Sequence, residues 1–498
     1  MTGQQRLVTK NLTGIPRDTR EVDAARPRAA RDGAPKSRDA ALAVRRGVTG
    51  RMRLGFESLG VRNYRLYWSG QVVSLIGTWM QQVSLPWLVL ALGGTPFQLG
   101  LVAAFQFLPA GLLAPFGGVL VDRVDKRLAM IATQVAAMVQ ATALFVLTVT
   151  GTIQIPMVMV LAFGLGVINA IDMPLRQSMA ADLVPRRTLA NAIALNAMAF
   201  NAARVAGPAL AGVIIAAGAS ALGSSIAGVA VNLGLNAVTY LAVLVALLRM
   251  DPHAIRRNAH HSRGQPVLAS LREGIAHAVT RPIVAWSLFL LGGVAAFGFN
   301  FTILLPLFAQ DVLHLGADGY GMLFATMGLG ALAGTLHLAF MRERPALRLM
   351  LGGGLLFGLF EIGVGISREV WLTAPFVLAS GYFSMLMLNT VNATVQANVS
   401  DGVRGRVMAL YVTVFAGSAP IGGLFAGGVA EAFGAPFAFV AGALISLLVI
   451  AITAWRLRVA AEQGRLGVTR IDATSMGRDA EAPGVAVGET SLRSAPRR

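Results

Sequence analysis

Apolar residues in this chain fall into about twelve blocks of roughly 20 residues, separated by short polar connections. A helix of that length crosses the hydrocarbon core of a bilayer, whereas barrel strands are about ten residues long and alternate apolar with polar positions. The blocks do not alternate, so the pattern predicts membrane-spanning helices. The expected spans are residues 65–92, 97–121, 128–150, 155–180, 189–217, 226–248, 283–308, 318–341, 349–366, 371–397, 407–430 and 436–457.

One connection, residues 249–282, is long and basic, and it divides the predicted helices into six plus six. The second and eighth spans resemble each other, because both begin with a glycine-containing helix start and end in charged residues. Two parallel six-helix repeats are a known transporter architecture with its binding site between the halves. We therefore expect an all-α integral membrane protein of twelve transmembrane helices in two parallel six-helix repeats, with a cavity between the halves.

The two ends of the chain contain too few apolar residues to bury an ordered core. This composition and the basic connection set the expected domain boundaries. They are residues 1–62, a disordered basic cytoplasmic N-terminal tail; 63–248, the N-terminal six-helix bundle; 249–282, a basic cytoplasmic linker; 283–457, the C-terminal six-helix bundle; and 458–498, a disordered cytoplasmic C-terminal tail.

Composition and charge support a membrane protein and indicate its orientation. Hydrophobic residues make up 55% of the chain and charged residues only 13%, and the mean hydropathy is +0.64. The net charge of +18 lies in the tails and in alternate loops, and Arg368 is the exception in the other set. Because positive loops stay in the cytoplasm, we expect a multi-pass protein of the bacterial inner (plasma) membrane with both termini cytoplasmic, and no nucleic-acid partner.

Several chemistries are not expected from this sequence. The chain has no cysteine, which excludes disulfides and thiolate metal sites, and no metal site or cofactor is expected. It has no phosphate-binding loop of the GxxxxGK[ST] type and no credible catalytic constellation, so we expect neither ATP drive nor an enzyme.

A charged stretch, "GGVLVDRVDKRLAM", interrupts the apolar pattern after the second span. Its spacing resembles the signature of the major facilitator superfamily, which reads Gly, three residues, Asp, a basic residue, any residue, Gly and two basic residues. Asp125 stands where the signature has its second Gly. The matching residues are Gly118, Asp122, Arg123, Lys126 and Arg127.

Other stretches, including "DMPLRQSMAADLVP" and "LANAIALNAMAFNAARVAGPALAG", resemble the exporters that include the enterobactin exporter and related macrolide and drug efflux proteins. The resemblance covers roughly residues 60–457. It implies a secondary active transporter, most simply a proton-coupled exporter of a small amphipathic molecule that works by alternating access as a monomer. An importer or lipid flippase with the same fold, and a transport-inactive sensor or scaffold, remain as alternatives.

In this family the signature Asp faces the start of the eleventh helix, here near Arg406 and Val407. Helix starts carry partial positive charge and attract carboxylates, so the resemblance predicts a latch that holds the cytoplasmic side closed. Lys126 and Arg127 are expected to meet anionic lipid or nearby carboxylates. The plainer interpretation is a loop that only sets topology, which would need Arg and Lys but not Gly118 and Asp122.

Charged residues inside a membrane are costly and usually mark a partner or a pathway. Asp172 and Arg176 lie one helical turn apart with Asn169 above them, and they form either a local ion pair or a carboxylate that carries the coupling proton. Arg204, with Asn201 on its face, lies near the middle of the membrane, and its expected partners are Asp172 or an anionic substrate group.

Further polar and small residues complete the candidate set. The stretch with Gly207, Pro208 and Gly212 resembles the fifth-helix motif of the superfamily's antiporters, and the alternative is ordinary helix packing. Glu361 is expected near the outer surface as a snorkelling carboxylate, and a coupling site is the alternative. Tyr64, Tyr67 and Trp68 are expected to form an aromatic anchor. Neutral polar residues expected to line the cavity are Gln81, Gln106, Asn169, Asn201, Asn300, Asn389 and Asn392.

Overall fold

The computed structural model describes residues 56–465, apart from 122–123, 256–266 and 342–346. The described residues lie in the larger of the two units into which the chain divides, residues 56–498, and most of the two expected tails lies outside the described residues. Its regular structure is helical throughout the described part. The long helices are α2 (Arg62–Ala91), α3 (Pro96–Val121), α4 (Lys126–Val149), α5 (Ile155–Asp182), α6 (Leu189–Leu222), α7 (Ser225–Arg249), α8 (Val267–Thr280), α9 (Pro282–Phe297), α10 (Phe301–Asp311), α11 (Ala317–Phe340), α12 (Leu347–Ile366), α13 (Val370–Ala397), α14 (Asp401–Phe433) and α15 (Ala435–Glu462).

The predicted all-helical membrane fold is confirmed. Eleven segments of the described chain are long and apolar enough to cross a membrane, and one of them, Pro282–Asp311, consists of α9 and α10 together. The remaining expected span is α2, which has 30 residues but carries Gln71, Gln81 and Gln82 and is therefore less apolar than the others.

Two features differ from the expected pattern. The seventh span is not one helix, because α9 ends at Phe297 and α10 begins at Phe301, and the amide of Asn300 between them donates to the α9 carbonyl of Ala296 at 2.9 Å. The linker contains a helix, α8, that hydropathy did not predict. It packs against α14, with Gly274 close to the backbone of Arg406.

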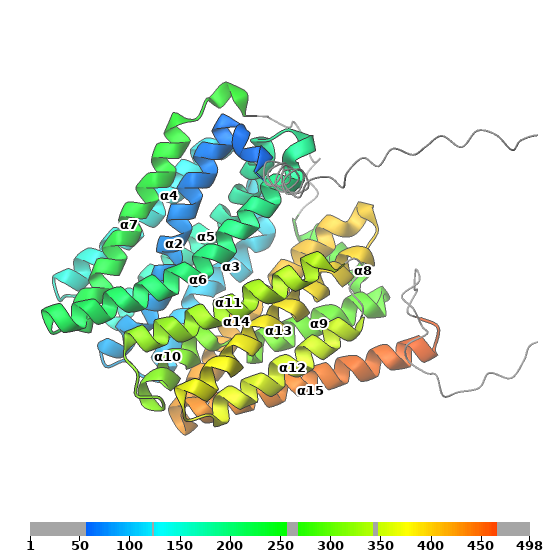
Figure 1. Cartoon of the computed structure of the whole chain (residues 1–498). Coiled ribbons are helices and arrows are strands. Elements are labelled where there is room, and N and C mark those ends of the chain that lie inside the picture. The colour runs from blue at the N-terminus through cyan, green and yellow to red at the C-terminus, as the bar shows by residue number, and fades with distance from the viewer. Residues whose placement is uncertain (1–55, 122–123, 256–266, 342–346, 466–498) are drawn as a thin grey trace, which may run out of the picture. The chain divides into compact units, whose positions relative to one another are not determined.

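The helices form two groups according to their contacts. Helices α2 to α7 pack mainly on one another, and α9 to α15 do the same (Figure 1). Two helix pairs, α3 with α14 and α6 with α11, make most of the contacts between the groups, and α10 adds smaller contacts with α2 and α3. We call these the N-terminal and C-terminal groups.

Glycines make both joining pairs close. A Cβ on Gly100 of α3 would lie 2.2 Å from the carbonyl oxygen of Gly423 in α14, and one on Gly111 would lie 2.9 Å from the Cα of Gly417. In the other pair, a Cβ on Gly212 of α6 would lie 3.0 Å from the Cα of Gly321 in α11. Backbones approach this closely only where no side chain stands between them.

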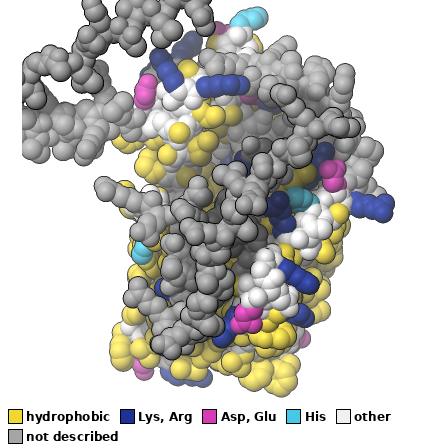
Figure 2. All heavy atoms as spheres, turned by 90° about the vertical axis from the view of Figure 1, so that its right-hand side faces the viewer, with side chains coloured by type: hydrophobic (Ala, Val, Ile, Leu, Met, Phe, Trp, Pro, Cys, Tyr) yellow, Lys and Arg dark blue, Asp and Glu magenta, His cyan; other side chains and the backbone are white. Residues whose placement is uncertain are grey.

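The two ends of the helices differ in charge. The end at which α2 begins and α3 finishes carries Lys126, Arg186, Arg249 and Arg281, and we call it the charged end. The opposite end, at which α3 and α11 begin, carries few basic residues, and we call it the uncharged end by contrast, although it holds Arg368 and separate carboxylates such as Glu369 and Glu431. Figure 2 looks onto the side of the molecule from which the linker helix α8 and the end of α15 project in Figure 1, and Lys and Arg side chains are spread over it.

Tyrosines near the start of α2 join helices of the N-terminal group. Tyr64 and Tyr67 are buried, and their hydroxyls donate to the carbonyls of Ala192 at 2.8 Å and Arg176 at 3.1 Å. The indole of Trp68 donates to Leu195 at 3.0 Å. The predicted aromatic anchor is therefore wrong for the two tyrosines, because helix–helix contacts and not the membrane interface surround them.

Candidate transport site

A buried carboxylate stands at the centre of a polar cluster in the N-terminal group. Asp172 of α5 is only 2% exposed. Its Oδ1 accepts hydrogen bonds from the hydroxyl of Thr133 at 2.7 Å and the amide of Gln134 at 2.8 Å, both in α4. Its Oδ2 is paired with Arg176 one turn further along α5. A buried charge needs both a counter-ion and hydrogen bonds, and Asp172 has both.

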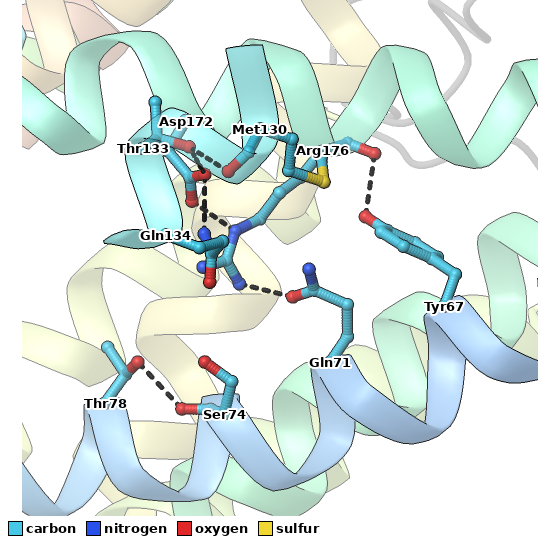
Figure 3. Close-up of polar contacts among 9 residues, drawn as sticks. All are labelled: Tyr67, Gln71, Ser74, Thr78, Met130, Thr133, Gln134, Asp172 and Arg176. Carbon is cyan, nitrogen blue, oxygen red and sulfur yellow. Dashed lines mark hydrogen bonds and ion pairs between the residues drawn. The ribbon is translucent and has the colours of Figure 1, made fainter. Parts of the chain in front are cut away.

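Arg176 extends this cluster to a third helix. Its guanidinium also donates to Oε1 of Gln71 in α2 at 2.5 Å, so it lies between the Asp172 carboxylate and the Gln71 amide (Figure 3). The ion pair therefore connects three helices, because Asp172 bonds to α4 and Arg176 bonds to α2. We call Gln71, Thr133, Gln134, Asp172 and Arg176 the Asp172 cluster.

Arg204 does not belong to the Asp172 cluster. Its guanidinium lies 5.7 Å from the ring of Trp79 in α2, and one of its nitrogens is 3.5 Å from the sulfur of Met385 in α13. The expected pairing of Arg204 with Asp172 is wrong, because the Asp172 carboxylate is already occupied by Arg176 and α4. Arg204 instead lies where the two helix groups meet.

The residues of the antiporter-type motif have two different neighbours. Gly207 faces α2, where a Cβ would lie 2.5 Å from that of Trp79. The carbonyl of Pro208 and the backbone of Gly212 face Gly321 of α11. The motif therefore lets α6 approach one helix of its own group and one of the other group, as small residues do in membrane helices.

The described residues of the charged signature act within the N-terminal group. Lys126 forms an ion pair with Asp182 at 2.5 Å, and Arg127 donates to the carbonyl of Leu247 at 2.8 Å, at the end of α7. Asp125 accepts from the backbone N–H groups of Arg127 and Leu128 and caps α4, which gives a physical reason for Asp where the signature has Gly.

The other three residues of the signature have no described side chains. Asp122 and Arg123 lie outside the described residues, and Gly118 lies in the part of α3 whose side chains are not described. The predicted partner, Arg406, forms an ion pair with Glu273 of α8. Val407 beside it is fully buried.

A carboxylate joins the two helix groups at the uncharged end. Oε2 of Glu431 in α14 accepts from the hydroxyl of Thr95 at 2.7 Å and from the backbone N–H of Phe97 at 2.8 Å. Thr95 and Gln98 also bond each other's backbone N–H groups, as in a capping box at the start of α3. We call the contact of Glu431 with Thr95 and Phe97 the Glu431 cap.

The neutral polar candidates have separate positions. Gln81 is not in the cavity as expected, because it is buried between α4 and α7 and bonded to Gln140 at 3.4 Å and Asn236 at 2.6 Å. Gln106 lies 3.5 Å from Gln82, and both line a small pocket between α2, α3 and α10.

The asparagines divide into those that bond another helix and those that do not. Asn389 donates to Thr335 of α11 at 3.3 Å. Asn201 and Asn300 donate to carbonyls of their own or the adjoining helix, and Asn300 is buried. Asn392 accepts from Gln396 one turn away and also forms a hydrogen bond with Tyr411 of α14. Asn169 is half-buried on α5.

Glu361 is not at the surface. It is fully buried in α12, and neither carboxylate oxygen has a hydrogen-bond partner among the described residues. The predicted snorkelling carboxylate is therefore wrong. Hydropathy placed it near the end of the span but could not show that the side chain faces the neighbouring helices.

Sequence reasoning missed several partners that complete these sites. They are Gln71, Thr133 and Gln134 around Asp172, Trp79 and Met385 around Arg204, and Glu431 at the start of α3. Gln71 and Gln134 were visible as polar residues within apolar spans, whereas Thr95 and Glu431 are separated by 336 positions and have no local signal. No group of three or more His, Asp or Glu suited to a metal ion occurs in the part of the chain described.

Comparisons with known proteins agree with this architecture. A family model described as transmembrane secretion effector matches residues 55–472. The staphyloferrin A transporter of Staphylococcus aureus is 24% identical over 379 residues, which cover 74% of this chain and 90% of that protein.

Solved structures show the same fold. A bacterial homologue of the human lysosomal transporter Spinster, in an inward-facing and unoccupied conformation, superposes with a TM-score of 0.63 at 15% identity and covers 80% of this chain and 96% of its own. A nucleoside transporter gives a TM-score of 0.64 at 11% identity, with 78% and 99% covered. Since the family model matches most of the chain, this protein belongs to the transmembrane secretion effector family of the major facilitator superfamily of membrane transporters.

Proposed function

We propose that this transporter is a proton-coupled exporter of a small amphipathic molecule, such as a siderophore, a macrolide or another drug, in the bacterial inner membrane. The charged end faces the cytoplasm, and the protein works as a monomer by alternating access. The observation that carries the proposal is the Asp172 cluster, in which a buried carboxylate inside a membrane helix bonds to α4 directly and reaches α2 through Arg176.

The Asp172 cluster provides a physical route for coupling. A proton that binds the Asp172 carboxylate removes its negative charge and weakens its hold on Arg176. Arg176 then keeps only neutral partners, including Gln71 of α2. Proton binding therefore weakens the bonds of Asp172 to α4 and frees Arg176 to move with α2, and proton release restores the ion pair.

Contacts between the helix groups support alternating access. The Glu431 cap and the contacts of Gly100 with Gly423 and of Gly212 with Gly321 hold the uncharged end closed in this conformation. Within the described part of the chain, Lys126 and Arg127 of the charged signature bond to Asp182 and to the carbonyl of Leu247, both in helices of their own group. This is the arrangement of a transporter whose substrate path opens toward the charged end.

The substrate class rests on similarity. The relative that is 24% identical is a transporter of staphyloferrin A, and we infer that a siderophore is the first substrate to test.

The test uses inside-out vesicles with an acid interior and a pH-sensitive dye. Siderophores, macrolides and lipophilic cations are added one at a time to vesicles with the native chain, with Asp172→Asn, and with Glu462→Gln as the matched control. Glu462 forms an exposed ion pair with Arg458 at 3.1 Å in α15, so its loss removes a carboxylate without touching the cluster.

Proton release on addition of one compound, lost in Asp172→Asn and kept in Glu462→Gln, is the expected result. Release that survives in Asp172→Asn would move the coupling away from this carboxylate. No release with any compound, from protein shown to be folded, contradicts proton-coupled export of this panel and favours a lipid flippase, an importer or a scaffold.

A further inference from the structure

Arg204 is too deep in the membrane for its charge to reach water along its own helix. It lies 15 residues after the start of the 34-residue helix α6, about 22 Å along the axis. An arginine side chain does not extend that far. The cost of its charge must therefore be offset by neighbours or by a bound group.

None of the described residues supplies an anion for Arg204. Nε of Arg204 is buried without a hydrogen-bond partner, and no carboxylate of the described chain forms an ion pair with it. Its contacts are the ring of Trp79 and the sulfur of Met385, which are weak partners for a full charge. Asp172, the expected counter-ion, is committed to Arg176.

Aromatic side chains from both helix groups surround this position. Trp79 of α2 packs against Phe200 of α6 with ring centres 5.5 Å apart, and against Phe324 of α11 at 6.5 Å. The backbone of Arg204 itself touches α11, since a Cβ on Gly328 would lie 2.9 Å from its carbonyl oxygen. The guanidinium is therefore a cation beside an aromatic wall at the junction of the two groups.

We propose that Arg204 binds a carboxylate of the transported molecule, while Trp79 and its aromatic neighbours contact the apolar part. The planar guanidinium donates two parallel hydrogen bonds to a carboxylate, and the bonds are strong where water is excluded. The unpartnered Nε supplies one of these donors. A cationic substrate would be repelled from the same place. This inference rests on the proposed function, because it names the substrate class of the transporter.

The location also connects binding to the conformational change. Arg204 belongs to α6, which contacts α2 within its group and α11 of the other group, and Met385 belongs to α13. A carboxylate on Arg204 therefore competes with the contact to Met385, which joins the two groups.

The experiment measures equilibrium binding to the purified full-length protein in lipid nanodiscs, without a proton gradient. The probes are a citrate-based siderophore, free of iron, and the same molecule with its carboxylates converted to methyl esters. The variants are Arg204→Gln and Arg204→Lys. Arg456→Gln is the matched control, because Arg456 lies over Trp286 at 5.3 Å and Trp455 at 4.9 Å on the surface of α15.

We expect the native protein to bind the acid about ten- to a hundred-fold more tightly than the ester. Arg204→Gln should remove this difference and leave ester binding unchanged. Arg204→Lys should keep part of it, because the charge remains but the paired donors are lost. Arg456→Gln should behave as the native protein does.

A preference for the acid that persists in folded Arg204→Gln overturns the proposal, and so does a native protein that binds acid and ester equally or binds neither. Thermal unfolding of each variant shows whether it is folded, and Arg204→Lys covers the case in which the glutamine variant is not. Failure of the vesicle assay with every compound contradicts proton-coupled export but not carboxylate binding, which is measured without a gradient. The opposite outcome is also distinguishable. If Arg204→Gln exports a neutral macrolide normally and the native protein shows no preference for the acid, then proton-coupled export holds and carboxylate binding by Arg204 does not.

Discussion

Removing the Glu431 cap is expected to let the uncharged end open more often. One carboxylate oxygen accepts two hydrogen bonds at the start of α3, at 2.7 Å from Thr95 and 2.8 Å from Phe97. A side chain that caps a helix start contributes about 1 kcal/mol, and a charge near that start adds about 0.3–1 kcal/mol when exposed. Because Glu431 is exposed, we take the lower end, about 1 kcal/mol, which corresponds to a roughly five-fold change in an equilibrium.

The assay exploits the absence of cysteine from the chain. Thr302→Cys places a single thiol beside the small pocket between α2, α3 and α10. Purified protein is labelled with a bulky maleimide, whose rate follows the population of open molecules. Glu431→Ala should raise this rate about five-fold, and Glu431→Gln by less, because the amide oxygen still accepts the hydrogen bonds without a charge.

Glu369→Ala is the control for this measurement. Glu369 is an exposed carboxylate just before α13 at the same end, and its side chain makes no capping hydrogen bond. An unchanged labelling rate in Glu431→Ala, or an equal rise in Glu369→Ala, refutes the idea that the cap holds the groups together.

Three further variants test packing and burial, each by thermal unfolding of purified protein. Gly100→Ala should lower the free energy of unfolding by about 1–3 kcal/mol, because the new Cβ would lie 2.2 Å from a carbonyl oxygen of the other group. Gly164→Ala should leave it unchanged, since nothing lies within 4 Å of a Cβ there. Equal stabilities of the two variants would contradict the described helix contact. Asp172→Asn should lower the free energy of unfolding by about 3 kcal/mol, because it leaves the partly buried Arg176 without its counter-ion. The double variant with Arg176→Gln should lose less than the sum of the losses of the two single variants. Additive losses would show that the two side chains do not interact. Glu361→Gln should be tolerated, because a neutral amide of the same shape replaces a carboxyl that has no partner, whereas Glu361→Lys should unfold α12 from its neighbours; a loss of stability in the glutamine variant as large as that in the lysine variant would show that the carboxyl has a partner.

Hydropathy predicted the membrane helices well because a span must satisfy its backbone internally and bury about 20 apolar residues. Hydropathy did not predict the break in the seventh span or the helix in the linker, because polar side chains determine both. The break at Asn300 comes from a side chain that bonds backbone carbonyls of α9. Helix α8 contains Arg272, Glu273 and His277, so its apolar face is diluted below the threshold of a span.

The candidate charges were identified from sequence, but their partners were not. Asp172 and Arg176 could be paired because four positions on one helix determine the contact. The bonds of Asp172 to α4 and the position of Arg204 against α13 depend on how helices rotate about their axes. These helices are apolar on all sides, so no periodicity shows which face of each one meets a neighbour.

Helices α3 and α14 touch at points spread along much of their length. From Phe97, held by Glu431, to Gly111, which touches Gly417, is about 21 Å of helix, and from Gly111 to the end of α3 is about 15 Å. If the pair turns about the Gly111 contact as a stiff lever, a separation of about 3 Å at the Glu431 cap becomes an approach of about 2 Å beside the charged signature. The arms are unequal, so the signature end moves less than the capped end for the same rotation. A larger side chain at Gly111 would then change how far the signature end moves for a given opening at the Glu431 cap, without altering the residues at either end.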